Sequence, residues 1–142
     1  SGQILIGDTG NAPSLATITA GAGISVTNGA HSIKVDNLVT LNAQTDSYTL
    51  VAGDAGKLIK MNKATANTLT IPKDATVDHA TGTQILIMQY GAGATTIAPE
   101  DGTINIRRDA DLTLVLGGQY SLAACIKIAD NEWCCGGNLI PA

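Results

Sequence analysis

Turn-forming residues recur along this chain about every eight to twelve positions, and this spacing limits the fold more than any other feature. Clusters of Gly, Pro, Asn and Asp interrupt short apolar stretches, and no competing window has the repeat of an amphipathic helix. Short strands joined by frequent turns are typical of two stacked sheets. The sequence therefore predicts an all-β protein, built as an antiparallel β-sandwich or jelly-roll-like domain.

The first 37 residues differ from the rest. Their expected strands, at 3–7, 15–19, 24–27 and 32–35, each carry only two or three apolar residues, and Asn28-Gly29 is typical of a hairpin turn. Such strands cannot enclose a core alone. We therefore expect residues 1–37 to form a β-rich oligomerising segment that needs either the later domain or copies from other subunits. Residues 38–142 are expected to form the sandwich.

A long hairpin is predicted near the end of the chain, at residues 119–139. Ala129-Asp130-Asn131 supplies the turn, and alternate positions before it share one strand face. The apolar members of that face are Tyr120, Leu122, Ala124, Ile126 and Ile128. We expect this hairpin to be the scaffold on which the preceding strands pack. The apolar stretch at 83–90 is expected to be a central strand, buried on both faces.

The three cysteines all belong to this hairpin. Cys134 and Cys135 are neighbours, so their side chains should point to opposite faces of a strand and should not pair with each other. Two interpretations stay open. The three thiols could be free and packed as small apolar groups, or Cys125 could form a disulfide with Cys134 across the hairpin. Zinc is not expected, because neither histidine lies near the cysteines in sequence.

Charge is sparse, at 14% of residues, and the formal net charge is −4. The one adjacent basic pair, Arg107-Arg108, is followed at once by acids, so we do not expect nucleic-acid binding. No apolar run is long enough for a membrane span, and no signal peptide is visible. So few charges indicate either surface hidden in an oligomer or a neutral β exterior. The first residues read like the middle of a longer protein.

Several segments resemble a module of tail fibres, tailspikes and related virion appendages of tailed bacteriophages. They are SYTLVAGDAGKLIKMNKATANTLTIP, GTQILIMQYGAGATTIAPEDGTINI and LTLVLGGQYSLAACIKIADNEWCCGGNL. The segment GQILIGDTGNAPSLATITAGAGISVTNGAHSIKV is similar to the Gly/Thr-rich stretch that often precedes such modules. The chain departs from the family pattern at Cys125, Cys134 and Cys135, and at the charged stretch 106–112.

The resemblance implies a β-rich, trimeric virion protein of the phage tail or capsid, made in the bacterial cytoplasm and without enzymatic activity or a cofactor. The expected partners are copies of itself, other virion proteins and a host-surface glycan or protein. Two alternatives stay open. One is a structural virion module without its own receptor, such as a head fibre, capsid decoration or fibre-assembly domain. The other is the carbohydrate-binding module of a larger depolymerase.

Charged turns are the candidate ligand-binding positions. The expected ligand-facing loops are residues 92–94, 99–102 and 107–111, at one end of the sandwich, with 73–82 as a further candidate. The candidate side chains are Glu100, Asp101, Arg107, Arg108, Asp109 and Asp111. These acids could hold Ca²⁺ through oxygen ligands, but their spacing fits a solvated turn paired to Arg107 and Arg108 better. We therefore expect no metal site and no catalytic carboxylate pair.

The aromatic residues and histidines are expected to be structural or plain surface residues. Trp133 could stack on a sugar, but its place in the hairpin favours packing. Tyr90 and Tyr120 lie at the ends of expected buried strands, so packing is expected there too. His31 and His79 have no Ser or Cys partner at the spacing of a catalytic triad and are expected at the surface.

Overall fold

The structure is a computed structural model that describes residues 3–8, 10–21, 24–29 and 32–142. Within these ranges the chain forms fifteen β-strands and one 3-10 helix, η1 (Ala52–Asp54). None of the described residues forms a helix long and apolar enough to cross a membrane. The chain divides into two compact units, residues 1–38 and 39–142. This boundary lies one residue from the position expected from the sequence.

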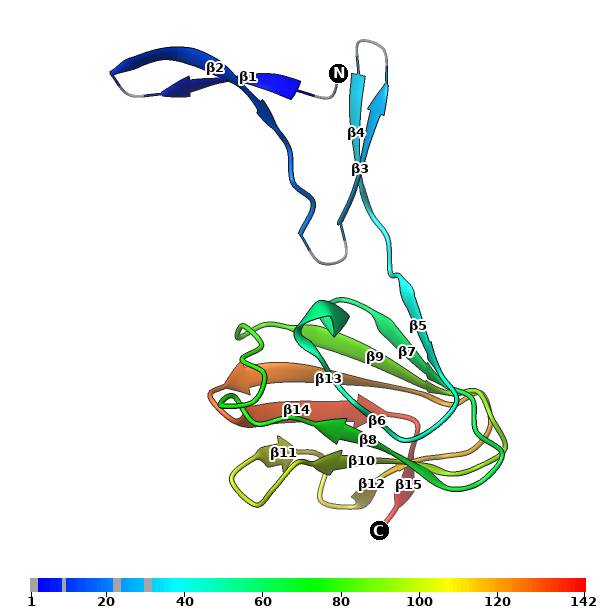
Figure 1. The fold of residues 1–142 in the computed structure, drawn as a ribbon. Helices are drawn as coiled ribbons and strands as arrows, with labels where there is room; N and C mark the ends of the chain where they lie inside the picture. The colour runs from blue at the N-terminus through cyan, green and yellow to red at the C-terminus, as the bar shows by residue number, and fades with distance from the viewer. Residues whose placement is uncertain (1–2, 9, 22–23, 30–31) are drawn as a thin grey trace. The chain divides into compact units, whose positions relative to one another are not determined.

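The first unit consists of two antiparallel hairpins. One pairs β1 (Gln3–Asp8) with β2 (Asn11–Thr17), and the other pairs β3 (Ile24–Gly29) with β4 (Ser32–Asn37) (Figure 1). Asn28 and Gly29 are paired strand residues rather than the turn, since Gly29 lies opposite Ser32. The expected turn position was therefore wrong. The connecting residues, His31 among them, lie outside the described part of the chain.

The second unit is a sandwich of two β-sheets (Figure 1). The five-stranded sheet contains, in spatial order, β15 (Leu139–Pro141), β12 (Leu112–Leu116), β10 (Thr95–Pro99), β8 (Asn67–Ile71) and β6 (Tyr48–Thr49). The six-stranded sheet contains β11 (Asn105–Arg107), β14 (Glu132–Gly137), β13 (Leu122–Ala129), β9 (Gln84–Gln89), β7 (Leu58–Met61) and β5 (Leu41–Gln44). The prediction of an all-β sandwich is confirmed.

The sheets are mixed, so the expected antiparallel pairing is present only in part of the sandwich. From β5 to β10 the chain passes from one sheet to the other at every turn, which makes β5, β7 and β9 parallel neighbours. The strands β6, β8 and β10 are parallel for the same reason. β12 and β13 then run antiparallel to β10 and β9. Turn residues show where a strand ends, but they do not show which sheet receives the next strand.

An aliphatic core fills the space between the sheets. It contains Leu50, Ile59, Met61, Leu69, Ile71, Ile85, Ile87, Ile97, Ile104, Leu116, Ala123, Cys125, Trp133, Cys135 and Leu139. β9 lies inside the six-stranded sheet, as expected for a central strand. Only one of its faces is fully buried, however, because Leu86 and Met88 remain half-buried on the outside.

The long hairpin is present as β13 and β14, but its buried face is the opposite of the expected one. Ala123, Cys125 and Lys127 point into the sandwich, whereas Leu122, Ile126 and Ile128 are exposed. Alternation identifies the two faces of a strand, and only packing decides which face is covered. The hairpin still joins the rest of the sheet through β9, which pairs with β13 along its length.

Candidate functional site

A buried lysine organises one end of the sandwich, which we call the loop end. Lys127, near the end of β13, is only 2% exposed. Its Nζ donates to Asp74 Oδ1 at 2.8 Å, to Asp78 Oδ1 at 3.1 Å and to the His79 carbonyl at 2.5 Å. One ammonium therefore fixes three positions of the 72–83 loop above the core.

The pKa values of this cluster favour an ion pair. Burial lowers the pKa of Lys127, but hydrogen bonds to Asp74 and Asp78 outweigh it, and the net pKa is raised. Burial likewise acts to raise the pKa of Asp74, but the hydrogen bonds from Lys127 and the Asn131 amide bring the net pKa below its ordinary value. Buried charges persist where they are paired and hydrogen-bonded in this way.

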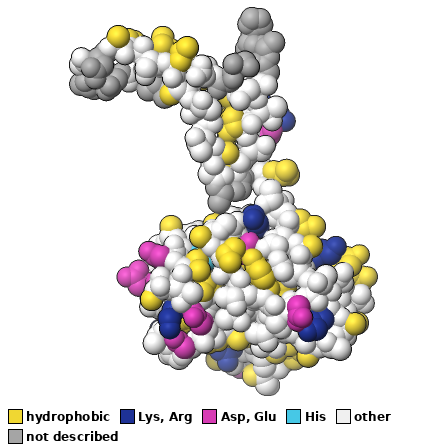
Figure 2. Space-filling model, viewed as in Figure 1, with side chains coloured by type: hydrophobic (Ala, Val, Ile, Leu, Met, Phe, Trp, Pro, Cys, Tyr) yellow, Lys and Arg dark blue, Asp and Glu magenta, His cyan; other side chains and the backbone are white. Residues whose placement is uncertain are grey.

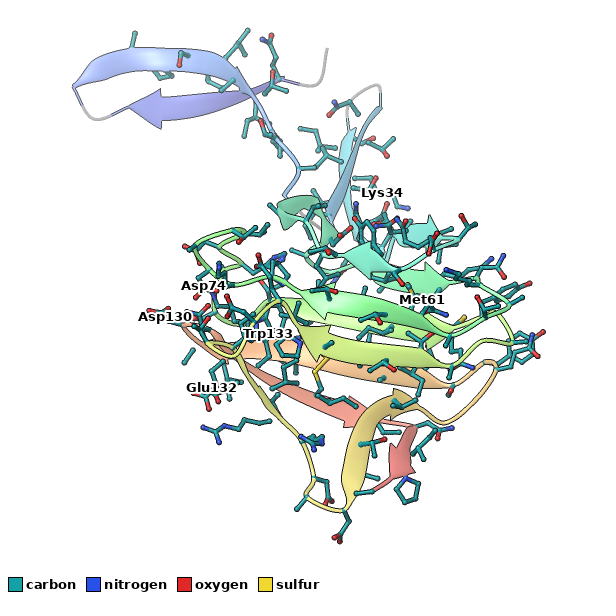
Figure 3. All side chains as sticks on the ribbon, turned by 60° about the horizontal axis from the view of Figure 1, so that its bottom comes forward. Lys34, Met61, Asp74, Asp130, Glu132 and Trp133 are labelled. Carbon is teal, nitrogen blue, oxygen red and sulfur yellow. A yellow bond between two sulfur atoms is a disulfide. The ribbon has the colours of Figure 1, made fainter. Side chains whose placement is uncertain are left out.

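A reciprocal pair of hydrogen bonds ties the loop to the β13–β14 turn. The Asn131 amide donates to Asp74 Oδ2 at 2.8 Å, and the Asp74 amide donates to Asn131 Oδ1 at 2.9 Å. Asn131 adopts a positive φ of 49°, a conformation that Asn tolerates better than most residues. Figure 3 shows Asp74, Asp130, Glu132 and Trp133 at the same end of the sandwich.

His79 and Trp133 form the buried floor of the loop end. Their rings meet edge to face at 5.6 Å, and Trp133 lies directly across from Lys127 in the hairpin. His79 is 3% exposed, so its expected surface position was wrong, and the expected packing role of Trp133 is confirmed. Burial, followed by the nearby Lys127 charge, lowers the pKa of His79. Neither His79 Nε2 nor Trp133 Nε1 has a hydrogen-bond partner.

Two of the sequence-predicted site residues belong to the loop end, where they connect loops. Glu100 accepts from the Lys73 amide at 2.9 Å and from Thr76 Oγ1 at 3.1 Å. Asp101 accepts from Lys73 Nζ at 2.9 Å and from Thr103. The Thr103 and Lys73 hydrogen bonds hold the pKa of Asp101 far below its usual range. Both carboxylates are thus engaged within the protein.

The other four predicted residues lie along β11 and the turn that follows it. Arg107 Nε donates to Glu132 Oε1 at 2.6 Å, and Arg108 Nε donates to the Leu112 carbonyl at 2.7 Å. Asp109 accepts from the Asp111 amide at 3.0 Å within the turn. The expected pairing of these acids with Arg107 and Arg108 is not observed, since Arg107 pairs with Glu132 instead.

The predicted loops do not all meet. Residues 92–94 precede β10, and residues 100–102 follow it, so the two loops lie at opposite ends of the same strand. Residues 73–82 and 99–102 do meet, because Glu100 accepts hydrogen bonds from Lys73 and Thr76. Their meeting follows from the parallel pairing of β8 and β10, which places Ile71 beside Pro99. The expectation that 92–94 shares an end with 99–102 was therefore wrong.

The opposite end, which we call the tyrosine end, carries an exposed aromatic pair. Tyr90 and Tyr120 are 38% and 62% exposed, and their rings meet edge to face at 5.6 Å. Their expected packing role was therefore wrong. Lys60 Nζ lies 3.8 Å from the centre of the Tyr90 ring, and Gln119 Nε2 donates to the Tyr90 carbonyl at 3.1 Å.

The backbone at Tyr120 is held in an unusual conformation. Its φ is +68°, which is uncommon for a bulky residue, and its amide donates to the Gln89 carbonyl at 2.6 Å. Such conformations persist where the surrounding structure enforces them, and they occur often at functional sites. An exposed, fixed pair of tyrosines beside a lysine and an amide can offer ring faces and hydrogen bonds to a ligand such as a sugar.

Both interpretations of the cysteines were wrong, because the disulfide joins Cys125 to Cys135. These two residues are direct partners across the hairpin, and both point into the core. Cys134 is exposed and free on the outer face. The strand pairing starts with Ala129 opposite Glu132, and its register shifts between Ala129 and Lys127. As a result Cys135, and not Cys134, lies opposite Cys125.

The sequence interpretation missed Lys127, Asp74 and Asp78. The available signal was the position of Lys127 in the hairpin. It lies two residues after Cys125, so both side chains are on the same face of the strand, and that face also carries Trp133 of the returning strand. A lysine in that register requires acidic partners if the face is buried. Among the described residues, no group of His, Cys, Asp and Glu side chains could hold a metal ion. Comparisons with protein-family models, curated proteins and solved structures find no match to this chain.

Proposed function

We propose that this chain is part of a bacteriophage virion fibre or tailspike, non-enzymatic and trimeric, that attaches the particle to the host surface. The observation that carries the proposal is the division into two hairpins, whose described residues contribute nothing to the buried core, and a sandwich that contains that core. An isolated hairpin is marginal in water. The hairpins expose Leu5, Leu15 and Val35, and Figure 2 shows hydrophobic side chains along them. Association of copies would cover such surfaces.

The tyrosine end is the stronger ligand-binding candidate of the two ends. Its rings are exposed, whereas Glu100, Asp101 and Arg107 at the predicted loops are already engaged in internal contacts. A glycan that stacks on Tyr120 and bonds to Gln119 would gain from a site fixed before binding. Three such sites on one trimer would bind a repetitive surface much more tightly than one.

A binding assay tests the proposal directly. Full-length chain is applied to a glycan array and to whole bacterial cells, alongside Tyr120→Ala and, as a matched control, Tyr48→Phe. The Tyr48 hydroxyl is engaged with Asp54 inside the sandwich, so this control should bind normally. We expect binding that Tyr120→Ala weakens at least tenfold. No binding to any cell or glycan, together with tight binding to virion proteins, would overturn the adhesion role.

A structural virion module is the second candidate. The engagement of the charged loop side chains in internal ion pairs favours it, because the loop end then serves rigidity rather than ligand contact. The same assay separates the two functions, since this module would bind virion proteins and no host surface.

A further inference from the structure

The outer face of the six-stranded sheet is apolar across most of its width, and we call it the apolar sheet face. The strand register aligns Leu41, Leu58 and Leu86 in one row across three neighbouring strands. Its large apolar side chains are Leu41, Leu58, Leu86, Met88, Leu122, Ile126 and Ile128. Leu41 is 57% exposed and Leu122 is 48% exposed.

Polar groups on this face are few. The Lys60 ammonium is occupied by the Tyr90 ring, and the ion pair of Arg107 and Glu132 lies at the β11–β14 edge. Between Lys60 and this ion pair, the outward side chains of the sheet include Gln84 and aliphatic groups. An apolar patch of a few hundred Å² is often a functional part of a protein surface.

The outer face of the five-stranded sheet serves as an internal comparison. Its outward positions are mainly threonines that pair across neighbouring strands: Thr49 with Thr70, and Thr68 with Thr96. Hydroxyl groups on that face can remain in water. The central strands of the two sheets therefore differ: β8 and β10 present threonines, whereas β9 and β13 present aliphatic side chains, and the exposed Ile140 of the five-stranded sheet lies on its edge strand β15.

Charge and area together select the occupant. The chain carries a net charge of −4, so copies repel each other overall, and a nearly uncharged face lets two copies meet without bringing like charges into direct contact. Six strands spaced about 4.8 Å apart and about five residues long cover about 400 Å². A stable interface needs about 800 Å² from each partner, so this face alone would hold a separate protein weakly. A copy already held through the hairpin unit would be at high effective concentration, and a small face then suffices.

We propose that the apolar sheet face is covered by another copy of this chain. This inference rests on the self-association in the proposed function and adds a second contact, within the sandwich, to the hairpin segment. Cys134 lies on the same face, beside Ile126 across the hairpin, and it is the free cysteine of the chain. Its thiol therefore reports whether the face is covered.

The test measures the rate at which a maleimide labels Cys134 in the full chain, together with the mass of the assembly by light scattering. We expect labelling of the native assembly at least tenfold slower than labelling of the chain in urea. Leu122→Asp should restore fast labelling and weaken the assembly. The variant's far-ultraviolet circular dichroism should match that of the unchanged chain, because Leu122 lies outside the core.

Thr96→Asp is the matched control, since it places the same charge at an outward position of the other sheet. It should leave both the mass and the labelling rate unchanged. An oligomer whose Cys134 is labelled as fast as in urea would overturn this inference alone. A monomer with fast labelling would overturn both this inference and the trimer of the proposed function. An equal effect of Thr96→Asp and Leu122→Asp would also contradict the assignment of the face.

Discussion

Replacing Lys127 by methionine tests whether the buried ammonium holds the loop end together. Methionine keeps the length and packing of the side chain but removes the three hydrogen bonds to Asp74, Asp78 and the His79 carbonyl. Removing one partner of a fully buried ion pair costs about 3–5 kcal/mol. The cost here should be smaller, because the Asp78 side chain is 79% exposed and returns to water.

The remaining losses set the magnitude. The His79 carbonyl loses a donor in a buried place, at a cost of about 1 kcal/mol, and Asp74 keeps only the Asn131 amide. We expect the free energy of unfolding to fall by about 2–3 kcal/mol and the melting temperature by about 10 °C. Urea unfolding followed by fluorescence measures this directly, because Trp133 is the single tryptophan, is fully buried and lies opposite Lys127.

Two further variants make the reasoning refutable. Lys73→Met is the matched control, since the Lys73–Asp101 pair is exposed and its loss should change stability little. Lys127→Met combined with Asp74→Asn should be more stable than the sum of the single effects, because Asp74 is left unpaired only in the single variant. If Lys127→Met is as stable as the unchanged chain, or if the two effects add, the buried ammonium does not organise this end.

Three other predictions concern the sandwich. The pKa of His79 is lowered on folding, so the unfolded chain binds more protons than the folded chain near pH 5. The free energy of unfolding measured in urea should therefore be lower at pH 5 than at pH 7.5. His79→Phe should reduce that difference. In a Cys125→Ala/Cys135→Ala variant the free energy of unfolding should fall by about 2.5–3 kcal/mol, because the disulfide closes a loop with a sequence separation of 10. Equal urea midpoints with and without the disulfide would contradict this. Gly93→Ala should prevent normal folding, because a Cβ there meets the Thr65 backbone, whereas Gly102→Ala, with open space around it, should fold normally by circular dichroism.

The local pattern of the chain determined its fold class. Alternating apolar residues and frequent turns are properties of short segments, so the sequence alone predicted an all-β sandwich and the hairpin of β13 and β14. The thin apolar content of the first strands likewise predicted a segment without its own core.

Tertiary structure decided the pairing of strands and the direction of each face. Parallel pairing of β8 with β10 brought the 73–82 and 99–102 loops together and separated 92–94 from them. The side of β13 that faces the core placed Lys127 and Cys125 inside and left Leu122 outside. Alternation separates the two faces of a strand but does not rank them. Where both faces carry apolar residues, only the neighbouring elements that cover one face decide which face is buried. The buried lysine and the apolar sheet face both result from that choice.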